Sequence, residues 1–290
     1  MTKAYNSDDI DLFHAITRFA LPPCFSEVHI RHFDAIDSTN TYLSEIRLKD
    51  ALVSWESSGS DLYVVSADHQ TCGRGKGDRQ WYSSSSHKSL ALSFLFPFPC
   101  SLTSRSALVT QLLALSAMEG INHLMGSDAI RLKWPNDLTL GNRKIGGILA
   151  EMHSLEGKGF NAIVIGIGLN LDIPDKVLES GIPMGRLWPP GAIKQLTGMD
   201  LDRKYVRDMI VLEFIRRLSD LILNEGIPSH ETMAALSRSQ LLVGEEIQFR
   251  EGSAIHRGIH RGLDDRGGLI LELSEEKGKS AVFFSGEIII

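Results

Sequence analysis

From Val28 onward, short runs of β-branched and aromatic residues alternate with longer segments whose apolar residues recur at helical spacing. Residues 105–124 are expected to form a buried helix and residues 203–223 a strongly amphipathic one. The strand-like runs are residues 62–67, 89–96, 129–134, 144–152 and 161–171. This mixture predicts an α+β fold, in which a mixed sheet has helices packed on one face.

Residues that break or turn strands mark several strand ends. Pro97 and Pro99 are expected to stop the strand that begins near Ser89, because proline lacks the backbone donor that a sheet uses. Residues 141–144, GNRK, predict a hairpin turn between the strand-like runs on either side.

The composition changes near Leu241, where short strand-like runs separated by glycine and charged turns begin. About 50 residues of this kind predict a small C-terminal β-barrel. We therefore expect an N-terminal extension (1–28), a large domain (29–238) and the barrel (239–290). The extension is expected to be too short for a helix-turn-helix domain with its own core.

The overall composition is that of a globular protein and argues against several classes. Of the 290 residues, 43% are apolar and 23% charged, and the formal net charge of −6 disfavours a broad basic face for nucleic acid. No apolar run approaches the roughly 18 residues that span a bilayer. Cys24, Cys72 and Cys100 lack metal-ligand spacing, so we expect free thiols in a reducing, cytoplasmic setting. His256 and His260 lie in strand-and-turn sequence and are expected at the surface rather than on a metal.

Residues 70–81, QTCGRGKGDRQW, combine three glycines with three basic residues in a chain that is acidic overall. One interpretation is an exposed turn with solvated charges. The other is an anion site, because glycines let backbone N–H groups approach an anion while Arg74, Lys76 and Arg79 neutralise it. The spacing fits neither the P-loop nor the dinucleotide fingerprint. The segment therefore indicates a phosphate or a carboxylate without specifying which.

The segment DSTN, residues 37–40, also has two interpretations. Asp37 or Ser38 can cap a helix that begins near Thr41. Alternatively, the hydroxyls of Ser38 and Thr39 and the helix N-terminus bind a polar ligand group.

Two further polar segments lie near predicted strand ends. In KWPND, Asn136 and Asp137 form either an Asx turn or a Mg²⁺ site that bridges phosphate oxygens. The segments RKIGG (143–147) and GIGLN (166–170) combine the strand-borne Lys144 with glycines, which are used where another group approaches the backbone closely.

Taken in order, these segments resemble the biotin protein ligases. The matching segments are DSTN, QTCGRGKGDRQW, KWPND, RKIGGILAE and GIGLNL, and the C-terminal GIHRGLDDRGGLILEL…GEIII resembles that family's terminal barrel. The resemblance implies a class II synthetase-like catalytic domain that binds biotin and ATP over residues 29–238. It also implies two steps: biotin's carboxylate attacks the α-phosphate of ATP to give biotinyl-5′-AMP, and a lysine of a carrier domain then displaces AMP.

The same resemblance assigns roles to individual residues. Lys144, Arg74 and Arg79 are expected to act in catalysis, with Lys144 between the biotin carboxylate and the α-phosphate. The expected biotin-binding residues are Ser38, Thr39, Asn40, Gln70, Arg74, Gly75, Lys76, Lys144, Gly147 and Gly166. The expected ATP-binding residues are Lys76, Arg79, Trp81, Asn136, Lys144 and Asn170, with Trp81 packing under the loop. Asp137 is the expected ligand of Mg²⁺, and biotin and ATP are the substrates.

Two loop residues depart from the family pattern, which commonly reads G-R-G-R-x-G-R. Lys76 replaces the second arginine, so the planar fork that grips a phosphate is lost, and Asp78 replaces a glycine and adds a negative charge. Both changes are expected to weaken retention of biotinyl-AMP.

Two other functions remain open on these residues. A lipoate ligase or octanoyl transferase has a related catalytic fold, and acyl transfer without ATP would need a thiol such as Cys72. A non-catalytic biotin or nucleotide sensor would fit the changes at Lys76 and Asp78. For the ligase, the expected partner is a biotin carboxyl carrier protein or a similar biotin-accepting domain. Neither nucleic acid nor a membrane is expected as a partner, and a homodimer is left open.

Overall fold

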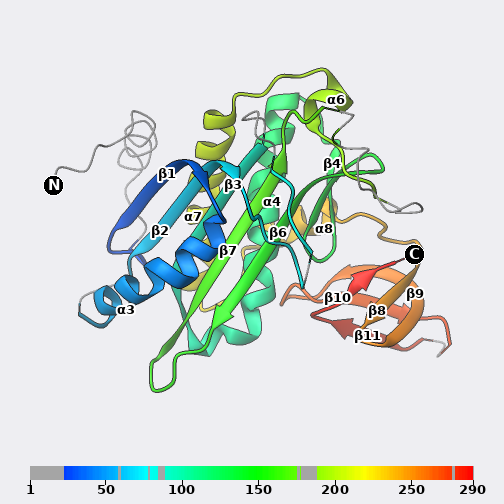
Figure 1. Ribbon diagram of the computed structural model, residues 1–290. Coiled ribbons are helices and arrows are strands. Elements are labelled where there is room, and N and C mark those ends of the chain that lie inside the picture. Colours follow the sequence, from blue (N-terminus) through cyan, green and yellow to red (C-terminus); the bar gives the residue numbers. More distant parts are fainter. Residues whose placement is uncertain are drawn as a thin grey trace.

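The computed structural model describes residues 23–57, 60–77, 79–83, 89–174, 177, 188–275 and 278–289. Most of the expected N-terminal extension and Asp78 of the glycine-rich loop lie outside these residues. The described chain forms one large sheet with helices and a smaller C-terminal sheet beside it (Figure 1).

The larger sheet has seven strands in the order β1-β2-β3-β7-β6-β5-β4. They are β1 (Val28–Ile36), β2 (Leu62–Gln70), β3 (Ser89–Pro99), β4 (Ile130–Lys133), β5 (Asp137–Leu140), β6 (Arg143–His153) and β7 (Phe160–Asn170). β1 runs parallel to β2, and the other neighbouring pairs are antiparallel. The predicted mixed sheet is therefore confirmed.

Two long helices cover one face of this sheet (Figure 1). They are α4 (Ser106–Met125) and α7 (Arg203–Leu223), and both lie where the helical spacing predicted them. Alternate residues of β3 point to this face, and the rings of Phe94 and Phe214 are 4.7 Å apart between centroids. The shorter helices are η2 (Cys100–Arg105), α6 (Ile193–Thr197) and α8 (His230–Ser239).

The opposite face of the sheet is covered only in part. Three short segments follow β1: α2 (Thr39–Thr41), the π-helix η1 (Tyr42–Arg47) and α3 (Leu48–Ser57). Trp55 of α3 belongs to a second core cluster with Tyr63 and Leu95, whose side chains point away from α4 and α7. The face that carries α4 and α7 agrees with the prediction of helices packed on one face, and this segment also covers part of the second face.

Two strand boundaries differ from the sequence-based prediction. β3 continues through Pro97 and Pro99, because β2 pairs with β3 only as far as Leu95 and leaves β7 as the one neighbour there. The turn at residues 141–144 joins β5 to β6, because the short strand β5, which was not predicted, lies between the two expected strands.

The C-terminal sheet is antiparallel and open, with β11 and β12 as its edges, so the closed barrel that was expected is not formed in the described residues. Its strands are β8 (Glu246–Glu251), β9 (Ala254–Leu263), β10 (Leu269–Leu273), β11 (Ser280–Phe283) and β12 (Glu287–Ile288). Trp134 from the large sheet packs into its core, 5.6 Å from the Phe249 ring, and donates its indole N–H to the Gly267 carbonyl over 3.1 Å. Trp134 therefore joins the two sheets.

Three smaller expectations can be compared with the structure. Cys24, Cys72 and Cys100 are free thiols, as predicted. The surface position expected for His260 is wrong, because its side chain points inward from β9 and is completely buried.

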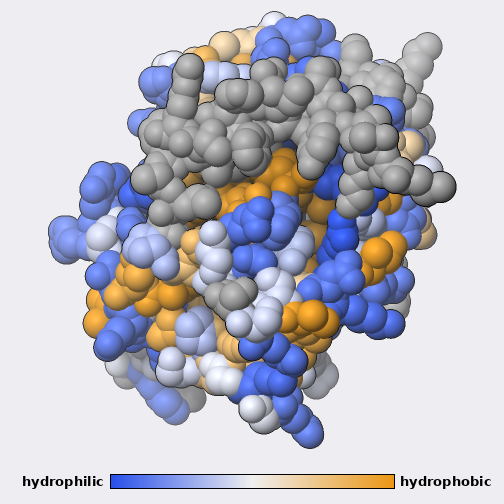
Figure 2. All heavy atoms as spheres, turned by 90° about the vertical axis from the view of Figure 1, so that its left-hand side faces the viewer, coloured by the Kyte–Doolittle hydropathy of each residue, from blue (hydrophilic) through white to orange (hydrophobic). Residues whose placement is uncertain are grey.

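Among the described residues, no helix combines the length and apolar character that crossing a membrane requires. Figure 2, which views the β1 side, shows mostly hydrophilic side chains interrupted by separate hydrophobic areas.

Candidate active site

A cavity of about 700 Å³ opens on the sheet face opposite α4 and α7. It is lined by all the residues that were predicted for the site: Ser38, Thr39, Asn40, Gln70, Arg74, Gly75, Lys76, Arg79, Trp81, Asn136, Asp137, Lys144, Gly147, Gly166 and Asn170. These residues come from segments spread over more than half of the large domain, so the fold brings them together. Their individual roles remain predictions.

The DSTN segment serves both as a helix cap and as cavity wall. The Ser38 hydroxyl accepts the Thr41 backbone N–H over 3.4 Å at the start of α2. Ser38 and Thr39 are almost fully buried and also line the cavity. The two interpretations of this segment are therefore compatible.

A chain of hydrogen bonds orders the polar side chains at this end of the cavity. Thr39 donates its backbone N–H to Gln70 Oε1 over 2.8 Å, and its hydroxyl oxygen lies 3.1 Å from the same oxygen. Ser93 donates its hydroxyl to Asn40 Oδ1 over 2.7 Å and lies 2.7 Å from the Thr39 hydroxyl. Because Gln70 uses its carbonyl oxygen inside this chain, its NH₂ group is left to donate to a ligand.

Glycines in β6 and β7 leave space on the sheet surface that any larger side chain at these positions would fill. A Cβ at Gly166 would lie 2.1 Å from Asn40 Oδ1, and a Cβ at Gly168 would lie 2.4 Å from the Trp81 ring. Gly166 and Gly168 therefore let Asn40 and Trp81 lie directly on the sheet. Gly146 was expected to serve the site as well, but it is buried and would place a Cβ against core side chains instead.

The two arms of the glycine-rich loop lie side by side as a narrow hairpin. Gly75 donates its N–H to the Arg79 carbonyl and Trp81 donates to the Gly73 carbonyl, each over 2.8 Å. A Cβ at Gly73 would lie 2.5 Å from the Trp81 carbonyl oxygen. Close approach of the arms is thus a reason for these glycines that sequence reasoning missed. Gly77, with φ of +65°, lies near the tip.

Lys144 and Asp137 form an ion pair on the cavity wall. The Lys144 ammonium donates to Asp137 Oδ1 over 2.5 Å, and both side chains are about one-fifth exposed. The ammonium also lies 5.8 Å from the centroid of the Trp81 ring. A Cβ at Gly147 would be only 3.1 Å from Lys144 Nζ, so the glycine keeps space for this ammonium.

The two predicted asparagines are held by backbone groups. Asn136 donates its Nδ2 to the Ile148 carbonyl over 2.6 Å. Asn170 donates its Nδ2 to the Gly191 carbonyl over 2.9 Å, and Gly191 in turn donates its N–H to the Lys144 carbonyl. Both amides therefore use their NH₂ groups for positioning, which leaves their carbonyl oxygens as acceptors or metal ligands.

The C-terminal sheet closes another side of the cavity. Lys76 donates to the Gly286 carbonyl over 3.4 Å, and Arg79 lies 3.4 Å from the Glu287 carboxylate. Arg250 and Glu287 also line the cavity. Sequence reasoning missed these two residues, because nothing in the sequence indicates that this sheet folds against the loop.

Three other cavity-lining residues were missed for different reasons. Ser93 is a hydroxyl residue among the apolar residues of β3, and this interruption is the signal that could have found it. Lys133 and Trp134 are buried and lie within KWPND, of which only Asn136 and Asp137 were predicted as site residues. Cys72, by contrast, is exposed and does not line the cavity, so the structure lends no support to acyl transfer through its thiol.

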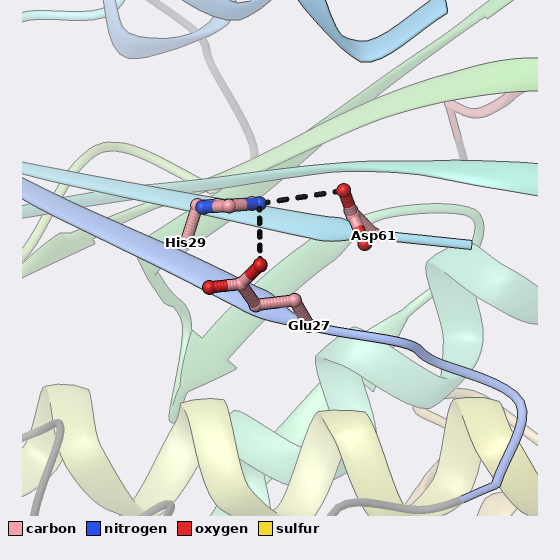
Figure 3. A group of neighbouring side chains, drawn as sticks. All are labelled: Glu27, His29 and Asp61. Atoms are coloured by element: carbon pink, nitrogen blue, oxygen red, sulfur yellow. Dashed lines mark hydrogen bonds and ion pairs between the residues drawn. The ribbon is translucent and has the colours of Figure 1, made fainter. Parts of the chain in front are cut away.

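A second group of potential metal ligands lies elsewhere in the fold. His29 Nε2 is 3.4 Å from Asp61 and 3.8 Å from Glu27 (Figure 3). None of the three lines the cavity, and they lie at the β1 edge, whereas Asp137 begins β5 near the other edge. The Asp61 oxygen nearest His29 also accepts the Ser54 hydroxyl, so hydrogen bonds within the protein account for it. Burial and the Asp61 charge raise the pKa of the neighbouring Tyr63.

The chain is similar to known proteins of one family. Residues 32–170 match the biotin/lipoate A/B protein ligase family. The chain is 31% identical over 260 residues to the bifunctional ligase/repressor BirA of Escherichia coli, covering 87% of this chain and 71% of that protein. It is 33% identical over 210 residues to the biotin–[acetyl-CoA-carboxylase] ligase of Paracoccus denitrificans, covering 71% of this chain and 82% of that protein.

The fold is also similar to that of a solved biotin protein ligase. The biotin protein ligase of Aquifex aeolicus in complex with biotin and ATP superposes with a TM-score of 0.67 and 25% sequence identity. The match covers 90% of this chain and 97% of that one. The chain belongs to the biotin protein ligase family.

Proposed function

We propose that this protein activates biotin with ATP and transfers it to a lysine of a biotin carrier domain. The observation that carries the proposal is the single cavity around Lys144, which is lined by the residues expected to bind biotin, ATP and metal. In the first step, a biotin carboxylate oxygen bonds to the α-phosphorus and pyrophosphate leaves. In the second, a lysine amine attacks the carbonyl carbon, AMP leaves and the nitrogen loses a proton. The substrate lysine belongs to a carrier of the acetyl-CoA carboxylase type, by analogy with the named relatives.

Biotin lies with its ureido head at the hydrogen-bonded end of the cavity. There the Gln70 NH₂ group donates to the ureido oxygen, and the hydroxyl of Ser38 or Thr39 completes the polar contacts. The apolar part of biotin follows the glycine-lined strands β6 and β7 past Gly147 and Gly166. This orientation directs the carboxylate toward Lys144.

Cationic groups are placed where the first step concentrates negative charge. Lys144 lies between the carboxylate and the α-phosphate and stabilises the charge that builds up as they join. Arg74, Lys76 and Arg79 approach from the loop hairpin, while Trp81 packs beneath it. The loop also shields the mixed anhydride from water.

Mg²⁺ fits the residues at the end of KWPND. Asp137 offers carboxylate oxygens and Asn136 an amide oxygen that its own backbone contacts leave free, and Mg²⁺ prefers such hard oxygen ligands. Phosphate oxygens and water would complete its coordination. When bound, the ion neutralises charge on the phosphates that face the loop and Lys144.

We also propose a cytoplasmic setting, which the three free thiols support, and no direct role in DNA binding, which the net charge of −6 supports. A gel shift with a biotin-synthesis promoter that showed specific retardation of the DNA would contradict the proposal on DNA binding.

We further propose that residues 29–238 form the catalytic domain and residues 239–290 a separate small domain, with 1–28 as an extension. A homodimer is compatible with the exposed edges of the sheets.

The test is pyrophosphate exchange into ATP that depends on biotin. The unaltered protein is expected to show exchange with biotin and none with lipoate. Lys144→Ala is expected to reduce the rate by about 100-fold or more, because the ammonium acts where charge develops. Lys158→Ala is the matched control, since Lys158 forms a surface ion pair with Glu56 outside the cavity. Binding of biotin without exchange would indicate a sensor, and exchange with lipoate a different acid as substrate.

A further inference from the structure

Glu151 is the last residue of the segment RKIGGILAE and is not among the predicted site residues. Gly147, Leu149 and Glu151 are alternate residues of β6, so they lie on the same face of the strand. Gly147 and Leu149 line the cavity. Glu151 itself is not a lining residue, and its side chain is one-quarter exposed. Its carboxylate therefore stands behind the residues that a ligand would meet.

The first partner of Glu151 is Arg74 of the loop hairpin. Arg74 Nη2 donates to Glu151 Oε1 over 2.6 Å, and Nη1 donates to Oε2 over 3.0 Å. Two parallel bonds fix the orientation of a guanidinium as well as its distance. The pair therefore ties one arm of the loop to β6.

The pair leaves Arg74 able to bind an anion. A guanidinium has five N–H donors, and the two bonds to Glu151 use two of them. The remaining three lie on Nε and on the outer positions of the two terminal nitrogens. Glu151 can thus hold Arg74 in place without competing for the donors that a carboxylate or a phosphate would use.

The second partner of Glu151 is Asn40, at the hydrogen-bonded end of the cavity. Asn40 Nδ2 donates to Glu151 Oε2 and to the Leu149 carbonyl, each over 3.3 Å. An ionised carboxylate only accepts, so it faces the NH₂ group and turns Asn40 Oδ1 toward the Ser93 hydroxyl. The chain continues because the Thr39 hydroxyl donates to Ser93 and the Thr39 backbone N–H donates to Gln70 Oε1.

We propose that Glu151 is a positioning residue that couples the placement of Arg74 in the loop hairpin to the orientation of the ureido-binding residues. The proposal rests on the proposed function and adds to it a link between the two ends of the cavity. When Glu151 is in place, the arginine that covers the adenylate and the asparagine that orders the biotin end share one carboxylate. Loss of that carboxylate releases both.

The substitution Glu151→Gln isolates this role. Glutamine keeps the size of the side chain, but it has one acceptor oxygen where glutamate has two, and its NH₂ group would face one of two donors. We expect biotinyl-AMP to dissociate about fivefold faster and the KM for biotin to rise by a similar factor. The KM for ATP is expected to change by less than about twofold, since Glu151 contacts the biotin end directly through Asn40 and reaches the adenylate only through Arg74.

A double-mutant cycle with Arg74 tests whether Glu151 acts through its partner. Arg74→Ala is expected to speed dissociation of biotinyl-AMP at least as much as Glu151→Gln. If Glu151 acts partly through Arg74, the double variant dissociates more slowly than the product of the two single effects predicts, and any excess over Arg74→Ala reports the Asn40 contact. Effects that multiply would overturn the proposal, as would dissociation from Glu151→Gln that is unchanged or slower.

The matched control is Glu213→Gln. Glu213 holds Arg216 with two bonds of 3.0 and 2.5 Å on α7, outside the cavity, so its loss removes a similar ion pair without touching the site. Its dissociation rate is expected to equal that of the unaltered protein. Exchange by the unaltered protein is measured first: its absence refutes the proposed function, whereas exchange with an unchanged dissociation rate in Glu151→Gln refutes only the role of Glu151.

Discussion

Lys144 Nζ lies 2.5 Å from Asp137 Oδ1, so the proposed catalytic ammonium and the proposed metal ligand form an ion pair. The strand register explains the contact, because Asp137 of β5 is opposite Gly147 of β6 and the glycine leaves room for the Lys144 side chain. The pair keeps both charges compensated on the wall of a cavity that is partly closed to water.

Asp137→Asn tests the metal side of this pair. An amide keeps the shape of the carboxylate but lacks its charge, so Mg²⁺ should bind more weakly while the fold is preserved. The Mg²⁺ concentration that gives half-maximal biotin-dependent exchange is expected to rise about tenfold. Asp200→Asn, which removes a surface partner of Lys194, is the control and should leave that concentration unchanged. An unaltered Mg²⁺ dependence in Asp137→Asn would remove this aspartate from the metal site.

Gly166→Ala tests the close packing at the biotin end. The new Cβ would lie 2.1 Å from Asn40 Oδ1 and 2.6 Å from the Ser93 hydroxyl, so the hydrogen-bonded chain must shift. The KM for biotin is expected to rise about tenfold or more, with a smaller change in the KM for ATP. Gly159→Ala is a matched control, because nothing lies within 4 Å of its added Cβ. Equal KM values for the two variants would contradict the assignment.

The double change Lys76→Arg and Asp78→Gly tests the two departures in the loop. An arginine fork can hold a phosphate with two bonds, and loss of the aspartate removes a negative charge from a loop that is expected to bind an anion. Biotinyl-AMP is expected to dissociate several-fold more slowly from the double variant than from the unaltered protein. The rates are measured by displacement of labelled adenylate. Identical rates would show that the two departures do not affect retention.

Much of the site could be predicted because its residues are grouped in short polar segments at the ends of strands. Lys144, Asp137 and Gln70 each lie in a short polar segment beside an apolar strand, and the family resemblance orders these segments. The mixed sheet and its two long helices follow from periodicity alone. The individual roles of these residues are still predictions.

What the sequence did not reveal depends on contacts between distant segments. The four residues of β5 are too few to show periodicity, and Trp134 looks like part of a turn until the C-terminal sheet packs around it. Glu287 reaches the loop from the end of the chain, and no local pattern marks it. The glycines of the loop were interpreted as letting the backbone approach an anion, whereas Gly73 is explained by how closely the two arms pack.

His260 makes the stability of the protein depend on pH. Its imidazole is completely buried in β9, and burial lowers its pKa below the ordinary value of 6.5. In the unfolded chain the histidine takes up a proton as the pH falls through about 6.5, while in the folded chain it does so only at lower pH. The unfolded state therefore gains protons first, and the free energy of unfolding should decrease as the pH falls from about 7 toward the depressed value.

Replacing His260 should remove this part of the pH dependence. Urea unfolding of the full chain at pH 7.5 and at pH 5.5 gives the change in unfolding free energy for the unaltered protein and for His260→Leu. The leucine variant is expected to lose less stability on acidification, because it has no buried group to protonate. His260→Gln provides a second variant of similar size should leucine disturb the sheet. If both variants lose as much stability between the two pH values as the unaltered protein does, the buried imidazole is not the source of the acid sensitivity.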